Sequence, residues 1–318
     1  MTPHATDMKA LVLTAIGTPP EVTSHPRPEP GPGEVRVRIG AASVNGFDLG
    51  VVAGYMQKMM EHRFPLVLGK DFAGTVDAVG SGVTGFAPGD RVFGEVARPY
   101  IGDGTFAEYV VVSADSAIAP LPEAVRFQDG GSLGIAGTTA RMSVDAAQLQ
   151  AGQTVLIVGA TGGVGTLAIQ LAAQAGARVI ATAHGDEARK LVESLGASEV
   201  IDHTQDLPGQ VRASHAEGVD AVVHLAGDPA AVLPLVRTGG RFVSTMLMSP
   251  DQLPGDKAKV VAIYHRPTRE MLEGLASEVV GGRLRVPVQR TYPLSEAPAA
   301  LRDFAGPNTL GKLVITID

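Results

Sequence analysis

The sequence predicts an α/β protein in which a doubly wound parallel sheet is inserted into a β-rich domain. Three observations support this fold class. The length of 318 residues suggests about two domains, and 45% apolar residues suffice for a sizeable core. Short Val-rich segments broken by Gly and Pro fill the first 125 residues, whereas helical and strand patterns alternate from there to about residue 265.

The first 125 residues read as strands bounded by turns, a spacing typical of a barrel or sandwich. The expected strands are "MKALVL" (8–13), "EVRVRIG" (34–40), "FAGTVDAVG" (72–80), "DRVFGEV" (90–96) and "FAEYVVV" (106–112).

Residues 126–265 alternate strands with helical patterns, which indicates crossover units and a parallel sheet. The expected strands begin with "TVLIV" (154–158) and "RVIATA" (178–183), and "KVVAIY" (259–264) is the last. Residues 266–318 hold one helix and ragged strands that resemble the N-terminal part. We therefore expect the chain to return to the first domain, with divisions at 1–125, 126–265 and 266–318.

Composition excludes several classes of protein. A net charge of −7 without a basic cluster argues against a nucleic-acid partner. The absence of cysteine excludes disulfides, thiolate zinc sites and a thiol nucleophile. No apolar run reaches the ~18 residues that span a bilayer, and the N-terminus does not resemble a signal peptide. We expect a cytoplasmic protein with no membrane partner.

A glycine turn follows the strand 154–158 and carries the strongest functional signal. Gly159, Thr161, Gly162, Gly163 and Val164 lie in "GATGGVG", and an apolar helical pattern follows. A strand, a glycine turn and a helix place a cofactor diphosphate at the helix N-terminus, as in a Rossmann domain. The alternative is an ordinary Gly-rich turn without a ligand.

The end of the next strand bears on the choice of dinucleotide. NAD-binding units usually place an acid there, but this strand ends in Thr182, Ala183 and His184. Arg189 and Lys190 follow on the next helix and could reach a 2′-phosphate, unless they merely form a solvated face. We expect NADPH, although Asp186 nearby weakens that expectation.

Two further motifs are incomplete. "GPNTLGKL" (306–313) lacks the Ser or Thr of a phosphate loop and precedes a strand. "GGSLG" (130–134) lacks the buried strand that a nucleophile elbow requires.

The ordered motifs "GKDFAGTVDAVG" (69–80), "GDRV" (89–92), "GTFAEYVVV" (104–112), "GATGGVG" and "GKLVITI" span nearly the whole chain. Together they resemble the medium-chain dehydrogenase/reductase superfamily, in particular its zinc-free quinone oxidoreductase branch. The resemblance implies a GroES-like catalytic domain interrupted by the Rossmann domain, with substrate in the interdomain cleft. It also implies a homodimer, in which a second copy covers the edge strand "KVVAIY".

The chain departs from the zinc-dependent members of that superfamily. Asn45 stands where they carry Cys, and Lys70 and Asp71 stand where they carry His and Glu. A lysine at neutral pH has no lone pair for a metal. We therefore expect no metal.

Without a metal, the acceptor must already be electron-poor, as quinones and α,β-unsaturated carbonyls are. The candidate catalytic residues are Asn45, Tyr55 and Lys70. Asn45 is an amide at a metal-ligand position, or alternatively a turn residue before Gly46. Tyr55 could supply a proton, or could be a half-buried tyrosine. Lys70 could stabilise negative charge, or could pair with Asp48 or Asp71.

The resemblance adds Thr139 beside the nicotinamide and His203 beside the adenosine. The sequence thus predicts an NADPH-dependent, zinc-independent reductase of a small-molecule quinone or enone. Two alternatives stay open: an enoyl-thioester or alkenal reductase on the same scaffold, and a non-catalytic NADPH-binding sensor.

Overall fold

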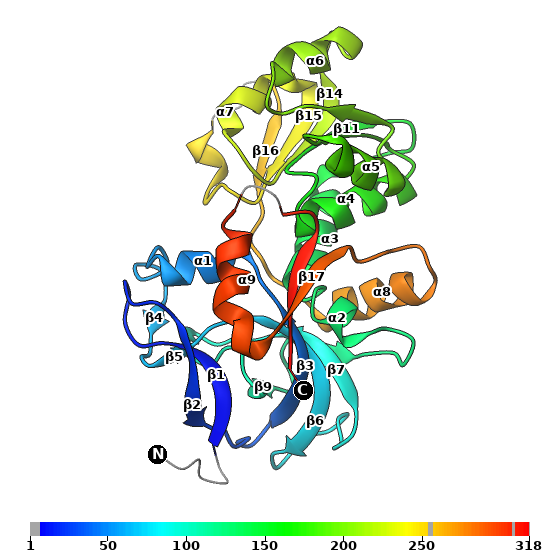
Figure 1. Cartoon of the computed structure of the whole chain (residues 1–318). Coiled ribbons are helices and arrows are strands. Elements are labelled where there is room, and N and C mark those ends of the chain that lie inside the picture. Colours follow the sequence, from blue (N-terminus) through cyan, green and yellow to red (C-terminus); the bar gives the residue numbers. More distant parts are fainter. Residues whose placement is uncertain (1–6, 254–256, 307–308, 318) are drawn as a thin grey trace. The chain divides into compact units, whose positions relative to one another are not determined.

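The computed structural model describes residues 7–253, 257–306 and 309–317 and divides into two compact units (Figure 1). The first unit comprises three segments, Met1–Ile135, Pro267–Gly281 and Val288–Asp318. The second comprises Ala136–Arg266 and Gly282–Pro287. The parallel-sheet unit is thus encoded between segments of the β-rich one, and the predicted fold class is confirmed.

The first unit is built mainly of antiparallel strands. Its strands are β1 (Asp7–Leu13), β2 (Glu21–Pro26), β3 (Glu34–Ser43), β4 (Glu61–His62), β5 (Leu66–Val67), β6 (Asp71–Val79), β7 (Arg91–Glu95), β8 (Tyr100–Ile101), β9 (Tyr109–Ser113), β10 (Ile118–Pro120), β17 (Val288–Pro293) and β18 (Lys312–Thr316). Its helices are α1 (Gly46–Val52), α2 (Phe127–Gly130), α8 (Arg269–Val280) and α9 (Ala297–Phe304).

The largest sheet of this unit joins the two ends of the chain. Its strand order is β10-β7-β6-β3-β18-β17, and β9 also pairs with β3. The C-terminal strand β18 runs antiparallel to β3, so that Ile315 lies opposite Ala42. The helix α2 contacts β3 and β6, which extends this unit to Ile135. The residues before the "GGSLG" motif form α2 rather than the buried strand that a nucleophile elbow requires.

Period-two alternation explains how β3 builds the core of the first unit. Val35, Val37 and Ile39 are at most 1% exposed and share one apolar cluster with Phe72 and Phe106. Alternate residues of a strand point to the same face, so these three side chains cover one side of the sheet.

The second unit contains a six-stranded parallel sheet with the order β13-β12-β11-β14-β15-β16. Its strands are β11 (Thr154–Val158), β12 (Arg178–Thr182), β13 (Glu199–Ile201), β14 (Val219–His224), β15 (Val236–Ser244) and β16 (Lys259–Ala262). Its helices are α3 (Ile135–Ala147, which begins at the boundary), α4 (Gly163–Gln174), α5 (Asp186–Ser194), α6 (Leu207–Ser214) and α7 (Pro229–Val232).

The strand order of this sheet fixes the place of a ligand. Every residue of β11 is buried, as expected of a central strand in a parallel sheet. The chain direction of the crossovers reverses between β11 and β14, and such a switch point opens a crevice at the carboxyl ends of the strands. The residues that follow β11, β12, β13 and β14 are therefore the candidates for cofactor contacts.

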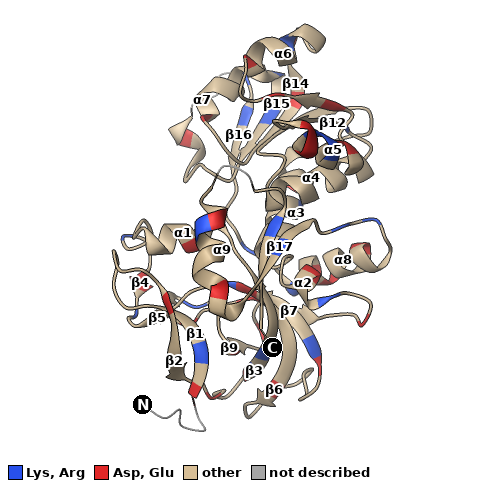
Figure 2. Ribbon diagram, in the orientation of Figure 1, with Lys and Arg blue, Asp and Glu red and all other residues tan. Residues whose placement is uncertain are grey.

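Charged residues are dispersed over both units. Figure 2 shows Lys and Arg scattered among the labelled elements, interspersed with Asp and Glu. Among the described residues, no helix is long and apolar enough to cross a bilayer.

The core assignment of the first unit can be tested at Phe106. Its side chain is fully buried, so Phe106→Ala should lower the free energy of unfolding by about 3–5 kcal/mol through lost burial and a residual cavity. Urea denaturation followed by circular dichroism measures this. Phe64 is 39% exposed, and Phe64→Ala is the matched control, for which the loss should be much smaller. Equal losses in the two variants would contradict the assignment.

Candidate active site

The glycine turn of the second unit lies between β11 and α4. Gly159 has φ +83°, a left-handed conformation that favours glycine. A Cβ on Gly165 would lie 2.3 Å from the carbonyl oxygen of Gly159, so helix and turn approach closely only without a side chain there. The N-cap of α4 is Gly162, whose backbone is extended.

This turn leaves the N-terminus of α4 open to an anion. The first N–H groups of a helix have no intrahelical partner, and Gly162 has no side chain to cap them. The amides of Gly163 and Val164 are among these donors, and the helix dipole adds positive potential. Thr161 lies beside them and is half-buried. These residues fit a diphosphate, which the structure can accept without displacing a capping side chain.

Thr182, at the end of β12, stabilises the turn from inside the protein. Its side chain is buried, accepts a hydrogen bond from the Gly159 amide at 3.1 Å and lies 3.4 Å from the Ile157 carbonyl, to which it donates. The structure therefore connects Thr182 to the conformation of Gly159.

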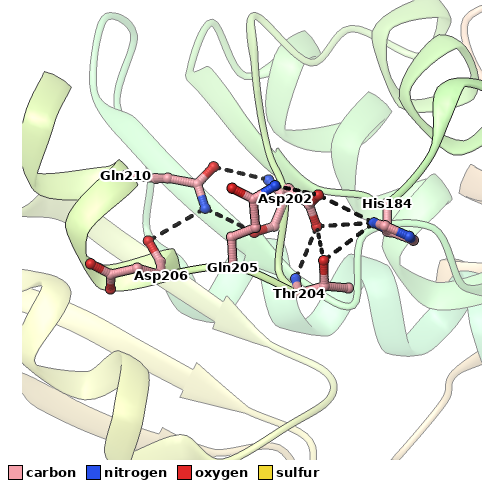
Figure 3. A network of polar contacts seen from close by, with 6 residues as sticks. All are labelled: His184, Asp202, Thr204, Gln205, Asp206 and Gln210. Carbon is pink, nitrogen blue, oxygen red and sulfur yellow. Dashed lines mark hydrogen bonds and ion pairs between the residues drawn. The ribbon is translucent and has the colours of Figure 1, made fainter.

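A polar network joins the segments that follow β12 and β13 (Figure 3). His184 Nδ1 lies 3.2 Å from both carboxylate oxygens of Asp202. Thr204 donates to Asp202 from its amide at 2.9 Å and its hydroxyl at 2.7 Å, and Gln205 donates at 3.2 Å. Hydrogen bonds from Thr204, assisted by His184, hold the pKa of the Asp202 carboxyl well below its usual range.

Asp202 is a residue that the sequence analysis missed. Its position at the carboxyl end of β13 was the available signal, since side chains there face the ligand crevice. The acid is engaged by Thr204 and His184. His203 lies beside the network, with its ring centroid 6.3 Å from that of His184.

The remaining predicted cofactor residues are spread over α3 and α5. Arg189 and Lys190 are exposed on α5, and Arg189 lies 3.9 Å from Glu193 one turn along the same helix. Thr139 is buried on α3, and its hydroxyl lies 3.1 Å from His265 Nδ1. Within the second unit, the structure thus brings His184 and His203 together, whereas Thr139 has a separate partner that sequence reasoning did not identify.

In the first unit, Asn45 is the centre of a buried polar cluster. Its amide nitrogen donates to the Ser43 carbonyl at 3.0 Å and to Asp71 Oδ2 at 3.1 Å. Its amide oxygen accepts from Lys312 Nζ at 2.6 Å. Both amide hydrogens are therefore used within the protein, and the orientation of the Asn45 side chain is fixed.

Asp71 and Lys312 are the opposite charges of this cluster. Asp71 accepts from the Ser43 amide at 3.0 Å and from the Ser43 hydroxyl at 2.8 and 2.9 Å. Lys312 also donates to the Val44 carbonyl at 3.0 Å. Both residues are at most 2% exposed. Burial raises the pKa of Asp71 and lowers that of Lys312, and the attraction between the two charges opposes each shift.

Asp48 borders the same cluster at the start of α1. Its Oδ2 accepts from the backbone amide of Asn45 at 2.8 Å, while its buried Oδ1 has no partner among the described residues. Burial raises the pKa of Asp48 to about 7, with the charge of Asp71 adding to the shift. A carboxyl with one unpartnered, buried oxygen favours the protonated form.

Lys70 and Tyr55 take no part in the hydrogen bonds described for Asn45. The Lys70 ammonium is 3.6 Å from the buried Glu95 carboxylate and 5.0 Å from the Phe47 ring centroid. Its ion pair in the structure is thus with Glu95, whereas Asp71 is bound by Ser43 and Asn45. Lys70 and Phe47 line a pocket of about 60 Å³. Tyr55 follows α1 and is 79% exposed.

The residues of the Asn45 cluster do not fit a metal ion. The Asn45 oxygen already accepts from an ammonium group, and the Asp71 carboxylate is saturated by Ser43 and Asn45. Lys70 stands where zinc-dependent dehydrogenases carry a histidine ligand, and it offers no lone pair when protonated. Among the residues that the structure describes, no three His, Cys, Asp or Glu side chains gather as metal ligands would.

The raised pKa of Asp48 predicts a pH-dependent stability. The folded state keeps the Asp48 proton up to about pH 7, whereas the ordinary aspartate pKa is 3.8, so the unfolded chain binds fewer protons between these values. The stability that protonated Asp48 adds to the folded state is complete below pH 3.8 and is lost as the pH rises through 7. As the pH rises across that range, the free energy of unfolding of Asp48→Asn should therefore increase by roughly 2–4 kcal/mol relative to that of the wild type.

Urea unfolding at several pH values measures the difference, and Asp115→Asn, which changes an exposed acid of the same unit, is the control. Parallel pH profiles for wild type and Asp48→Asn would show that Asp48 titrates as in the unfolded chain.

Substitutions of Gly162 and Gly165, at the start of α4, distinguish the approach of a ligand from the packing of the helix. Gly165→Ala places a Cβ against the backbone of Gly159 and Ala160 and should lower stability by about 1–3 kcal/mol. A Cβ on Gly162 meets nothing nearer than 3.6 Å, so Gly162→Ala should keep the melting temperature but weaken dinucleotide binding. Thermal denaturation and NADPH fluorescence titration distinguish the two. Wild-type NADPH affinity in Gly162→Ala would argue against a diphosphate at this turn.

Comparisons with known proteins agree with this geometry. Residues 31–123 match the alcohol dehydrogenase GroES-like domain, and residues 163–264 match the family described as zinc-binding dehydrogenase. The chain is 31% identical to the quinone oxidoreductase of Sus scrofa, over 89% of each protein. It is 34% identical to a mycocerosic acid synthase-like polyketide synthase of Mycolicibacterium smegmatis, of whose length it spans only 15%.

Among solved structures, the quinone oxidoreductase from Coxiella burnetii aligns with a TM-score of 0.88 at 29% identity, over 98% of this chain and 100% of that one. The members of this family are oxidoreductases that bind a nicotinamide cofactor. The glycine turn, the strand order and these relatives lead to one conclusion: the chain belongs to the medium-chain dehydrogenase/reductase superfamily, in its quinone oxidoreductase branch.

Proposed function

We propose that this protein is an NADPH-dependent, zinc-independent reductase of quinones or activated α,β-unsaturated carbonyls. The observation that carries the proposal is the bonding of Asn45 and Asp71 to Lys312 and Ser43, which leaves no ligand set for a metal. An acceptor reduced without a Lewis acid must be electron-poor before hydride arrives.

The second unit supplies the residues that would hold the cofactor. The amides of Gly163 and Val164 would bind the diphosphate, with Gly159, Thr161 and Gly162 allowing its approach. His184, His203, Arg189 and Lys190 would surround the adenosine ribose and favour a 2′-phosphate. Thr139 would lie beside the nicotinamide. The bound cofactor supplies the hydride; the protein supplies binding, orientation and electrostatics.

Asp202 bears on the preference for NADPH. A free carboxylate beside the ribose would favour the 2′-hydroxyl of NADH and repel a 2′-phosphate. Here its oxygens already accept from Thr204 and lie 3.2 Å from His184, which leaves fewer acceptor sites for a ribose hydroxyl. The network of Figure 3 is therefore compatible with a 2′-phosphate.

The first unit supplies the residues that would meet the acceptor. Lys70, in its small pocket beside Phe47, would stabilise negative charge on the reduced oxygen. Tyr55, which is exposed, would donate the proton to the product anion or order the acceptor. Asn45 would act by fixing this part of the unit, because both hydrogens of its amide are already donated.

One observation favours enoyl-thioester reduction as the second candidate. The 34% identity to polyketide synthase chains covers 93% of this chain, so a domain of similar length occurs within those synthases. A non-catalytic NADPH sensor remains the third possibility, because the chemistry needs few side chains.

A homodimer is also part of the proposal. The strand β16 is the last in the order of its sheet, so one of its edges has no partner strand among the residues that the structure describes. Met246 and Met248, in the segment between β15 and β16, are more than half exposed. Pairing with a second copy would cover such an edge. The cytoplasmic location stays a prediction.

A cofactor and substrate panel tests the proposed function. We expect NADPH oxidation with quinones and enones, a much weaker response with NADH, and full activity after prolonged chelation with EDTA. Faster turnover of an enoyl thioester would favour the second candidate, and tight NADPH binding without any turnover would favour the sensor. Loss of activity on chelation, restored by zinc, would refute zinc independence.

A further inference from the structure

A buried histidine and serine lie side by side at the carboxyl ends of β14 and β15. His224 is the last residue of β14 and is fully buried, and it pairs in register with Ser244, the last residue of β15. The imidazole lies over the Phe242 ring at a centroid distance of 5.5 Å and an interplanar angle of 27°. Neither His224 nor Ser244 has a role in the function proposed above.

The hydrogen bonds of His224 indicate which ring nitrogen carries the hydrogen in the neutral form. Nε2 lies 3.2 Å from the Gly227 carbonyl, which can only accept, so Nε2 carries the hydrogen. Nδ1 lies 3.0 Å from the Ser244 hydroxyl, and that hydroxyl accepts from the Met246 amide at 3.0 Å. The chain of donors therefore runs from Met246 through Ser244 to a neutral imidazole.

Through these bonds the imidazole connects two loops. Gly227 lies in the loop after β14, and Met246 lies in the loop after β15. The Thr245 amide also donates to the His224 carbonyl at 3.2 Å. Loss of the side-chain bonds would leave these loops held to the strand ends only by backbone hydrogen bonds such as that of Thr245.

The first of these loops packs against the glycine turn. His224 pairs in register with Val158, the residue before Gly159. A Cβ on Gly159 would lie 3.0 Å from the Ala226 side chain and 3.2 Å from that of Leu225. The strands β11 and β14 flank the switch point, where such sheets bind their ligand.

We propose that His224 and Ser244 form a positioning pair, which holds the loops after β14 and β15 in the conformation that binds the dinucleotide. The inference rests on the proposed cofactor site and adds to it two residues that do not touch the reacting atoms. It applies to NADPH and NADH alike, because the pair shapes the walls of the crevice rather than its adenosine end.

Burial makes the pair sensitive to acid. Desolvation lowers the pKa of His224, and it outweighs the opposing effects of the Gly227 carbonyl and the Asp228 carboxylate. A protonated ring would have to donate from Nδ1, and the Ser244 hydroxyl could no longer donate to it. The stabilisation that neutral His224 provides is complete above the ordinary histidine pKa of 6.5 and is lost as the pH falls below it.

The test compares NADPH affinity, by fluorescence titration, in His224→Asn, Ser244→Ala and Ser244→Thr. We expect the dissociation constant to rise about tenfold in His224→Asn and Ser244→Ala, the equivalent of one lost hydrogen bond, and to recover in Ser244→Thr, which keeps the hydroxyl. The double variant should lose little more than either single one, because both break the same chain of bonds.

The control is His215→Asn, which removes a contact to Glu199 in the same unit and should leave the affinity unchanged. Hydrogen exchange should quicken at residues 225–228 and 245–248 in His224→Asn. Between pH 7 and pH 5, the NADPH affinity of the wild type should fall more than that of His224→Asn.

Wild-type affinity in folded His224→Asn and Ser244→Ala would overturn the inference and leave the proposed function intact. If His224→Asn does not fold, equal affinities of Ser244→Ala and Ser244→Thr would overturn it instead. Failure of the wild type to bind either dinucleotide would remove the proposed function, and the inference with it.

Discussion

The buried cluster in which the Asn45 side-chain amide joins Lys312 to Asp71 is the interaction on which the first unit depends. Lys312 begins the last strand of the chain, and Asn45 and Asp71 lie at the starts of α1 and β6. Two charges buried this deeply are tolerable only if their hydrogen bonds are satisfied, and Ser43, Val44 and Asn45 satisfy them. The C-terminal strand is thereby fixed beside Val44 and Asn45, which are encoded 268 and 267 positions earlier.

The same cluster limits which ligands its oxygens can bind. An amide and a carboxylate at this place could bind a metal, but here their oxygens are occupied by an ammonium group and a hydroxyl. Outside this cluster, Lys70 lies 3.6 Å from Glu95, whose carboxylate offsets its charge. In the second unit, backbone geometry has the corresponding role, since Gly159 and Gly165 permit the contact of turn and helix.

Much of the fold was predictable, because its local patterns agree with its tertiary structure. The expected strand 154–158 matches β11. The described part of residues 266–318 contains two helices rather than the one expected, namely α8, capped by the Thr268 side chain, and α9. Prediction was less accurate where packing overrides pattern. The apolar segment "PAAVLPLVRTG" (229–239) forms only the short α7, because Pro234 follows and β15 already begins at Val236. The contacts of α2 with β3 and β6 likewise depend on the tertiary structure.

The sequence alone determined the order of elements, the glycine turn, the absence of thiol ligands and the membership of a family, since each depends on residue types at short spacing. Only the tertiary structure decided which polar groups meet. Lys312 with Asn45, Asp202 with His184, and His224 with Ser244 are separated by 267, 18 and 20 residues. Their pairing follows from strand register and sheet order, which bring distant strand ends together, and no local pattern encodes that proximity.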